Sequence, residues 1–185
     1  IDKLEKTNKV ERTKNSVGIA CCRQNDYNEV ELLMVCRRCT YAFDLFMQGI
    51  YNINNDGEIL ALLNDMTVDE KIIILSLDFK IVWYYWWMNS PVNKQYLFYL
   101  RNKFMKLATN DGQRLKRLIC KSQNGGKIWE IPKGKRKHDE SDIIGSIREF
   151  GEETGMCKSD YRFIRSEPRI NTFTDCNVKY VTKYF

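Results

Sequence analysis

Hydrophobic and polar positions divide the chain into a strand-rich start, a helical middle and a mixed end. Two short, partly β-branched apolar runs at 16–22 and 31–36 predict strands, and the polar stretch 23–29 between them predicts a hairpin loop. From residue 40 to about 118 the apolar residues recur at three- and four-residue spacing, which is typical of helices. The middle of the chain is therefore expected to form a helical lobe.

The longest helix of this middle part is predicted to begin at the T-x-x-E capping box of Thr67–Glu70. It is expected to run to Met88, because Pro91 lacks the backbone N–H that a continuing helix would use as a hydrogen-bond donor. A second, basic helix is predicted over 93–108 and a short third helix over 113–121. One apolar stripe follows the long helix and contains Leu75, Phe79, Val82, Trp83, Trp86 and Trp87.

The last third of the chain returns to alternating strands and helices. A strand is predicted at 128–131, followed by the loop 132–140, which has no apolar residue after its proline. Ser141 is a suitable N-cap for a helix over 142–154, and Gly155 stands where a left-handed C-cap residue is expected. Two further strands, joined by a loop rich in Asn and Thr, are predicted at 161–166 and 178–185.

Composition places the chain among globular proteins and excludes a membrane span. Hydrophobic residues make up 43% and charged residues 29% of the 185 residues, and no apolar run approaches the roughly 18 residues of a spanning helix. The polar start shows no secretory signal. Because the chain begins with Ile1 and stops in what reads as the middle of a strand, we expect a fragment of a longer product.

The seven cysteines include one C-x-x-C, Cys36 and Cys39, with no second pair at zinc-ligand spacing. We interpret them as reduced, structural cysteines of a cytosolic type of protein rather than zinc ligands.

Positive charge is concentrated in one segment. Residues 41–70 hold six acids and no Lys or Arg, whereas 71–121 hold ten Lys or Arg and two acids, a net charge of +8 against +6 for the whole chain. Such a concentration favours a polyanion, nucleic acid above all, as partner. The alternative is a solvated helix surface without a ligand.

Glu149, Glu152 and Glu153 carry the clearest chemistry of the sequence. At spacings i, i+3 and i+4 they share one face of the predicted helix 142–154. Three carboxylates repel one another unless a cation neutralises them, and a hard divalent cation prefers oxygen ligands. An acidic solvated face is the plainer interpretation of this spacing taken alone.

The surrounding residues resemble the Nudix box, G-x5-E-x7-R-E-U-x-E-E-x-G-U with U apolar. Every defined position matches over 134–156, from Gly134 through Glu140 and Arg148 to Met156. The chain is thereby identified as a member of the Nudix hydrolases. The resemblance implies an α/β fold, a Nudix α/β/α sandwich, and Mg²⁺ or Mn²⁺ as cofactor.

Carried onto matching positions, the resemblance makes Glu149, Glu152 and Glu153 metal ligands, with Glu149 or Glu152 as base for the attacking water. It adds the backbone carbonyl of Lys133 as a further ligand. It also implies that Arg148 and Glu140 pair to brace the loop, although Glu140 can instead face the metals. A later acid often completes the metal site; Asp175 is the candidate and Glu167 the alternative.

The residues before the box narrow the resemblance. The run Trp129–Lys135 (WEIPKGK) resembles the lead-in of mRNA-decapping Nudix enzymes, and the wider chain resembles those of large cytoplasmic DNA viruses, of the African swine fever virus type. That likeness implies a helical domain inserted after the first strands. We therefore expect a first part of the Nudix core at 1–39, a basic RNA-binding insert at 40–118, and the rest of the core at 119–185, truncated at its C-terminal end.

Basic residues in two places are candidates for contacts with substrate or RNA. Near the metals, the box loop could hold phosphates of the cap bridge or the nearest RNA phosphates, or could be merely solvated. These residues are Lys133, Lys135, Arg136 and Lys137. The candidates in the insert are Lys94, Arg101, Lys103, Lys106, Arg114, Lys116 and Arg117.

Aromatic residues suggest a slot for the methylated guanine of a cap, which stacks between rings. The cluster consists of Trp83, Tyr84, Tyr85, Trp86 and Trp87. Helical spacing favours a core role for this cluster, with Tyr85 expected to face outward. Trp129 fits core packing and base stacking equally well.

The function that these features favour is removal of the 5′ cap of mRNA, releasing 7-methylguanosine diphosphate and 5′-monophosphate RNA. Capped mRNA is the expected partner and the cytoplasm, that of a host cell if the protein is viral, the expected location. Two alternatives remain: a hydrolase of diphosphoinositol or dinucleoside polyphosphates, and an RNA-binding module with an inactive core.

Overall fold

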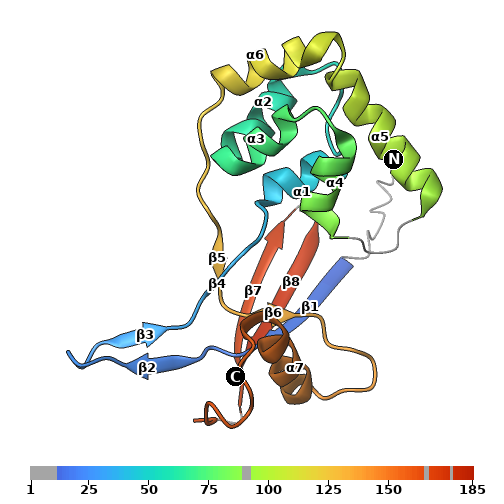
Figure 1. Cartoon of the computed structure of the whole chain (residues 1–185). Coiled ribbons are helices and arrows are strands. Elements are labelled where there is room, and N and C mark those ends of the chain that lie inside the picture. The colour runs from blue at the N-terminus through green and yellow to red at the C-terminus, as the bar shows by residue number, and fades with distance from the viewer. Residues whose placement is uncertain (1–11, 89–92, 165–166, 176) are drawn as a thin grey trace, which may run out of the picture. The chain divides into compact units, whose positions relative to one another are not determined.

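The computed structural model describes residues 12–88, 93–164, 167–175 and 177–185. The described residues form two compact units, one made of those in 12–35 and 129–185 and the other of those in 36–128. Figure 1 shows the first as the sheet-containing part and the second as a group of helices. We call them the α/β unit and the helical unit. The predicted end of the insert at residue 118 falls inside a helix, so the helical unit extends to residue 128.

The α/β unit has a mixed sheet with the strand order β6-β1-β8-β7. β1 and β8 are parallel, and the other two pairs are antiparallel. β2 and β3 form a separate hairpin over the loop predicted from the sequence. The elements are β1 (Arg12–Gly18), β2 (Cys22–Gln24), β3 (Val30–Leu32), β5 (Trp129–Glu130), β6 (Lys133–Gly134), α7 (Asp142–Thr154), β7 (Arg169–Asp175) and β8 (Val178–Tyr184). The α/β class expected from the sequence is present.

Helix α7 lies against β1 and β6. Gly145 lets the helix approach the sheet closely, because a Cβ there would stand 3.2 Å from a methyl group of Val17. Phe150 is fully buried and meets the edge of Tyr161, with 5.0 Å between ring centroids. Lys183 of β8 donates to the Asp142 carboxylate at 2.6 Å, which fixes the first turn of α7 over the sheet.

Two predictions for the last strands were wrong. Residues 161–164 form no strand, and 165–166, the rest of that predicted strand, lie outside the described residues. The segment predicted as an Asn- and Thr-rich loop contains β7 instead. Every side chain of β7 is exposed, so the strand has no buried alternate positions to reveal it in sequence. Its pairing with β8 stabilises it.

The helical unit is built from amphipathic helices whose buried stripes meet in one core. Phe43, Ile59, Leu63, Ile74 and Leu115 have no exposed surface. The elements are α1 (Tyr41–Met47), α2 (Asp56–Asp65), α3 (Val68–Leu75), α4 (Phe79–Trp87), α5 (Lys94–Leu107), the 3-10 turn η1 (Asn110–Gly112) and α6 (Gln113–Lys121). The short strand β4 (Val35–Cys36) pairs with β5 where the chain enters and leaves this unit.

The long helix predicted from Thr67 to Met88 is two helices, α3 and α4. The expected capping box of Thr67 and Glu70 is present at the start of α3. The helix then breaks at Leu77, whose φ of 56° is left-handed, and Asp78 caps α4 by accepting from the Lys80 amide at 2.8 Å. Pro91, the predicted stop, lies outside the described residues. The apolar period continues across the break, so periodicity alone did not reveal it.

Buried polar side chains close the helical unit. The Glu70 carboxylate accepts from the amide of Thr40 at 2.6 Å, from its hydroxyl at 2.9 Å and from the Thr67 amide at 2.9 Å. The buried Lys71 donates to the carbonyl of Gln123 and to the side chain of Asn124 at 3.0 Å. These bonds connect the first and last segments of the unit.

Candidate active site

The three box glutamates project from a helix that is defined by local sequence. Ser141 caps α7 by accepting from the Ile144 amide at 3.4 Å, and Gly155 ends it with a left-handed φ of 75°. β6 precedes this helix, and the loop 135–140 connects them. The predicted helix and both of its caps are confirmed.

Gly134 brings the backbone of β6 against the Glu149 carboxylate. A Cβ at residue 134 would lie 1.9 Å from Glu149 Oε2 and 2.6 Å from Oε1. No side chain larger than hydrogen can occupy this position unless the carboxylate moves. The glycine therefore sets where Glu149 presents its oxygens.

Arg148 connects the loop to the helix. Its Nη2 and Nε donate to the two oxygens of Glu140 at 2.6 and 3.1 Å, and Nη2 also donates to the Lys135 carbonyl at 3.0 Å. The pairing that the sequence predicts is thus present. Because of the Arg148 guanidinium and the Lys137 amide, the pKa of Glu140 is lowered to about 2. Of the two orientations considered for Glu140, the structure therefore shows the one in which its carboxylate faces Arg148.

The same guanidinium holds two of the three glutamates predicted as metal ligands. Arg148 Nη1 donates to Glu149 at 2.8 Å and to Glu152 at 3.2 Å. Glu153 instead accepts from the Lys133 backbone amide at 2.9 Å. Burial raises the pKa of the Glu153 carboxyl, although this amide bond opposes the shift. Glu149 and Glu152 thus face Arg148, while Glu153 faces β6.

The donor set fits a hard divalent cation in its chemistry. Glu149, Glu152 and Glu153 offer only carboxylate oxygens, the ligands that Mg²⁺ and Mn²⁺ prefer. Gly134 leaves room for one of these carboxylates against the strand backbone. Within the described ranges, however, no three His, Cys, Asp or Glu side chains converge closely enough to hold a metal ion. The glutamates lie on one helix and are engaged by Arg148 and the Lys133 amide instead.

Asp175, the candidate for a further metal ligand, lies far from the box. It pairs with Val178, whereas Gly18, the partner of Lys133, pairs with Tyr184 at the other end of β8. Six strand residues at about 3.3 Å each separate the two levels by roughly 20 Å. The structure therefore does not bring Asp175 to the box. Its alternative, Glu167, precedes β7 at the same end of the sheet as Lys133.

The bases of the box loop differ in how far they are engaged. Lys133 pairs with Glu130. Arg136 donates to the Glu140 carbonyl at 2.6 Å and lies 3.3 Å from Asp142. Lys135 and Lys137 are exposed at the surface. Asp142, which also binds Lys183, was not predicted as a site residue, because nothing local in the sequence connects residues 41 positions apart.

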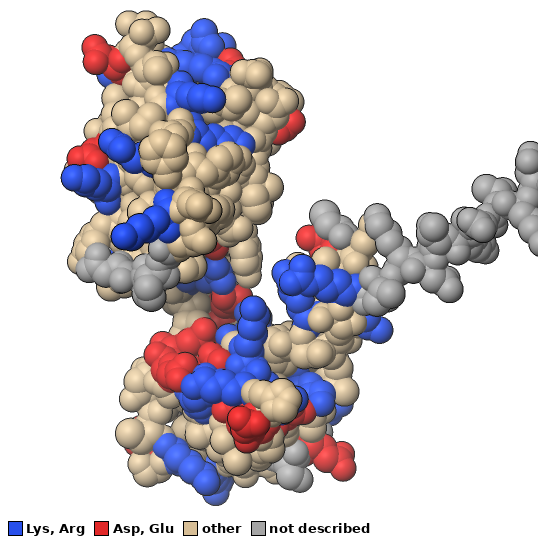
Figure 2. Space-filling view, turned by 90° about the vertical axis from the view of Figure 1, so that its right-hand side faces the viewer, with Lys and Arg blue, Asp and Glu red and all other residues tan. Residues whose placement is uncertain are grey.

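The bases of the helical unit are also unequal. Lys103 donates to the carbonyls of Gly49 and Tyr51 at 2.7 and 2.6 Å, so its charge is used inside the unit. Arg114 and Arg117 both pair with Asp56, at 2.6 and 3.0 Å. The other four predicted contacts are exposed: Lys94, Arg101, Lys106 and Lys116. Figure 2 shows Lys and Arg spread over this unit, with uncharged surface between them.

The aromatic cluster of α4 is largely a packing feature. Trp83 and Trp86 pack against the core, and Trp86 donates to Asp44 at 2.8 Å. Tyr85, expected to face outward, is half-buried against Phe43, and this burial raises its pKa. Tyr84 and Trp87 are exposed instead. Trp129, left open by the sequence, is 57% exposed and therefore outside the core.

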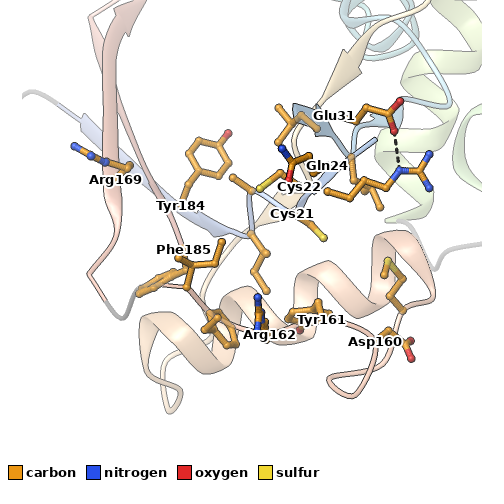
Figure 3. Close-up of a pocket in the computed structure, with 18 of the residues that line it drawn as sticks. Cys21, Cys22, Gln24, Glu31, Asp160, Tyr161, Arg162, Arg169, Tyr184 and Phe185 are labelled. Carbon is orange, nitrogen blue, oxygen red and sulfur yellow. Dashed lines mark hydrogen bonds and ion pairs between the residues drawn. The ribbon is translucent and has the colours of Figure 1, made fainter. Parts of the chain in front are cut away.

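A cavity of about 1010 Å³ lies in the α/β unit, and the sequence did not predict it. Figure 3 shows Tyr161 and Arg162 on one side of it and Cys21 and Cys22 on another. Of the residues predicted for the site, Glu167 alone lines the cavity as the structure describes it. Its wall comes from the segment after β1, the β2–β3 hairpin, the segment after α7 and the end of β8.

Comparison with known proteins decides the family. The chain is 36% identical over 180 residues to the mRNA-decapping protein g5R of African swine fever virus from a warthog isolate, covering 93% of this chain and 72% of that protein. The g5R protein of the Badajoz strain is likewise 36% identical, with 93% and 70% covered. The chain belongs to the g5R mRNA-decapping family. No family model matches it. Among the helices that the structure describes, none is long and apolar enough to cross a membrane.

Proposed function

We propose that this chain removes the 5′ cap of mRNA by hydrolysis that depends on Mg²⁺ or Mn²⁺. The products are 7-methylguanosine diphosphate and RNA with a 5′-monophosphate. The observation that carries the proposal is the box helix of a g5R-family chain, with Glu149 lodged against the backbone of Gly134. The substrate is capped mRNA, and the reaction belongs in the cytoplasm, where such RNA is translated.

The α/β unit is proposed to be a Nudix α/β/α sandwich. Helix α7, lying against β1 and β6, provides one helical layer. The carboxylates of Glu149, Glu152 and Glu153, with the carbonyl of Lys133, would hold the metal. When bound, the metal neutralises phosphate charge and lowers the pKa of a coordinated water.

The remaining steps fall to the side chains. Glu149 or Glu152 accepts the proton of the attacking water, whose oxygen forms the new bond to phosphorus as the bridging P–O bond breaks. The leaving phosphate keeps the bond electrons and remains on the RNA. Arg148 holds the loop and orients both candidate bases, at 2.8 and 3.2 Å. Lys135 and Lys137, exposed beside the helix, bind the anionic bridge.

The helical unit is proposed to bind the RNA body. Lys94, Arg101, Lys106 and Lys116 are exposed there and can contact phosphates, which supply most of the affinity for RNA. Lys103, Arg114 and Arg117 are better explained as internal contacts of the unit.

The test uses RNA labelled in its cap phosphates, with Mn²⁺ or Mg²⁺ added. The unmodified chain should release 7-methylguanosine diphosphate, and Glu149→Gln should lower the rate at least 100-fold, on the scale of a lost catalytic base. Asp139→Asn is the matched control, because that carboxylate is 98% exposed and stands outside the defined box positions. Hydrolysis of a diphosphoinositol polyphosphate without cap release would instead favour a small-substrate enzyme. Equal rates for Glu149→Gln and the unmodified chain would refute the assignment of Glu149.

A further inference from the structure

Helix α5 exposes large apolar side chains along its solvent face. Leu100, Phe104 and Leu107 form its buried stripe. On the opposite face Phe98 is 62% and Met105 41% exposed. At seven residues apart they lie on one line along the helix, about 10 Å from each other. A single exposed apolar side chain needs no explanation, but two in one line form a surface strip.

This strip is enclosed by positive charge. Helix α5 carries Lys94, Arg101, Lys103 and Lys106 and no Asp or Glu. Lys94 and Arg101 follow one side of the strip, at i−4 and i+3 from Phe98, and Lys106 lies on the other side. Lys103 is excluded because its ammonium is bound to two carbonyls. In Figure 2, positive and uncharged surface alternate on the helical unit.

Tyr99 extends the aromatic surface on the Lys106 side. Its ring is 52% exposed, and Lys103 Nζ lies 6.0 Å from its centroid. Tyr99 is therefore positioned by the contacts that hold α5 to the segment around Gly49, where a Cβ would lie 3.7 Å from the tyrosine ring. Unlike Trp83 or Trp86, the rings of Phe98 and Tyr99 are largely open to solvent.

We propose that Phe98, with Tyr99 beside it, stacks on unpaired bases of the transcript while Lys94, Arg101 and Lys106 hold its phosphates. This inference rests on the proposed function and adds its RNA class: the helical unit binds single-stranded RNA. An aromatic side chain can stack on a base only if that base is not already stacked on its neighbours. In a duplex the bases are paired and stacked on one another. Aromatic rings between cations are the usual arrangement for single strands, and they give little preference for sequence.

Charge complementarity favours RNA over a protein on this face. Helix α6 of the same unit carries Arg114, Lys116, Arg117 and Lys121, also without an acid. Asp56 of α2 neutralises part of this charge by pairing with Arg114 and Arg117. The face of α5 has no such acid in its own helix, so a polyanion with flat, stackable groups matches both its charge and its rings.

The experiment measures binding of the full chain to an unstructured RNA and to a duplex of the same length, by fluorescence anisotropy. We expect Phe98→Ala to weaken single-strand binding about 5- to 150-fold, the effect of losing one stacked base. Phe98→Trp should restore it, and duplex affinity should stay the same. Arg101→Ala should weaken binding to both RNAs and lower the salt slope by about one. Ile72→Ala is the matched control, because Ile72 is 59% exposed on α3 of the same unit.

Each result bears on the inference separately from cap hydrolysis. A capped dinucleotide has no RNA body, so the Phe98→Ala variant should cleave it at the same rate as the unmodified chain. If neither chain cleaves it but single-strand binding still depends on Phe98, the proposed function fails and this inference stands. Equal loss for single strand and duplex, no loss at all, or a change of oligomeric mass in Phe98→Ala by light scattering would overturn the inference.

Discussion

Replacing Gly134 by Ala is expected to separate the effect on catalysis from the effect on folding. The added Cβ would lie 1.9 Å from Glu149 Oε2, whereas real Cβ contacts shorter than 3.0 Å are essentially absent. The carboxylate must therefore retreat by at least about 1.1 Å. It is the far end of a flexible side chain, and Gly134 needs no left-handed φ, so the backbone can stay in place.

The expected magnitudes differ for activity and stability. Misplacing a reacting group by about 1 Å costs on the order of 100-fold in rate. For folding, the displaced Glu149 loses its 2.8 Å bond to Arg148, a loss of about 1–2 kcal/mol for a charged hydrogen bond near the surface. Gly134→Ala should thus fold with a modest decrease in the free energy of unfolding and hydrolyse caps about 100-fold more slowly.

The assay pairs single-turnover cap hydrolysis with urea unfolding. Gly126→Ala is the control, because a Cβ there meets nothing within 4 Å and it has no left-handed φ. Its rate and stability should match those of the unmodified chain. Full activity in Gly134→Ala would refute the idea that the close contact between the Gly134 backbone and the Glu149 carboxylate positions Glu149. A loss of stability above about 4 kcal/mol would show instead that Gly134 is needed for folding.

Three further predictions concern polar contacts. Arg148 lowers the pKa of Glu140 to about 2. The contribution of Glu140 to stability is therefore present above the unfolded pKa of about 4.3 and is lost as the pH falls toward about 2. Glu140→Gln should flatten this part of the curve of stability against pH, as measured by thermal unfolding. Glu70→Gln places an NH₂ group where a buried oxygen accepts hydrogen bonds, and should lower the free energy of urea unfolding by about 1–3 kcal/mol. Lys103→Met should destabilise the helical unit by about 1–3 kcal/mol yet weaken RNA binding less than Arg101→Ala does, by calorimetry and anisotropy.

Controls make these three outcomes decisive. Asp139→Asn, at a carboxylate whose side chain is 98% exposed, should leave the low-pH limb of unfolding nearly unchanged. An unchanged limb in Glu140→Gln would contradict the Arg148 pairing. Native stability in Glu70→Gln would mean that its three donors find other acceptors. If Lys103→Met lost as much RNA affinity as Arg101→Ala, the Lys103 ammonium would have to face the RNA.

The sequence by itself determined the parts of this protein that depend on near neighbours. Ser141 caps the start of α7 and Gly155 its end. The spacing of Glu149, Glu152 and Glu153 places them on one helical face wherever that helix lies. The pairing of Arg148 with Glu140 was implied by the resemblance to the Nudix box, and the structure contains it. Hydrophobic period likewise predicted a helical middle, since each helix there has its own buried stripe.

Only the tertiary structure decided what depends on residues far apart. Leu77 breaks one predicted helix into two although the apolar period continues across it. Asp175 lies at the wrong end of the sheet for the box because register, not spacing, fixes its level. Lys103 and Arg114 count as cations in sequence, yet internal partners more than 50 residues away engage them. Composition sums charge along the chain, but only packing selects which charges and which rings, such as that of Phe98, remain at the surface.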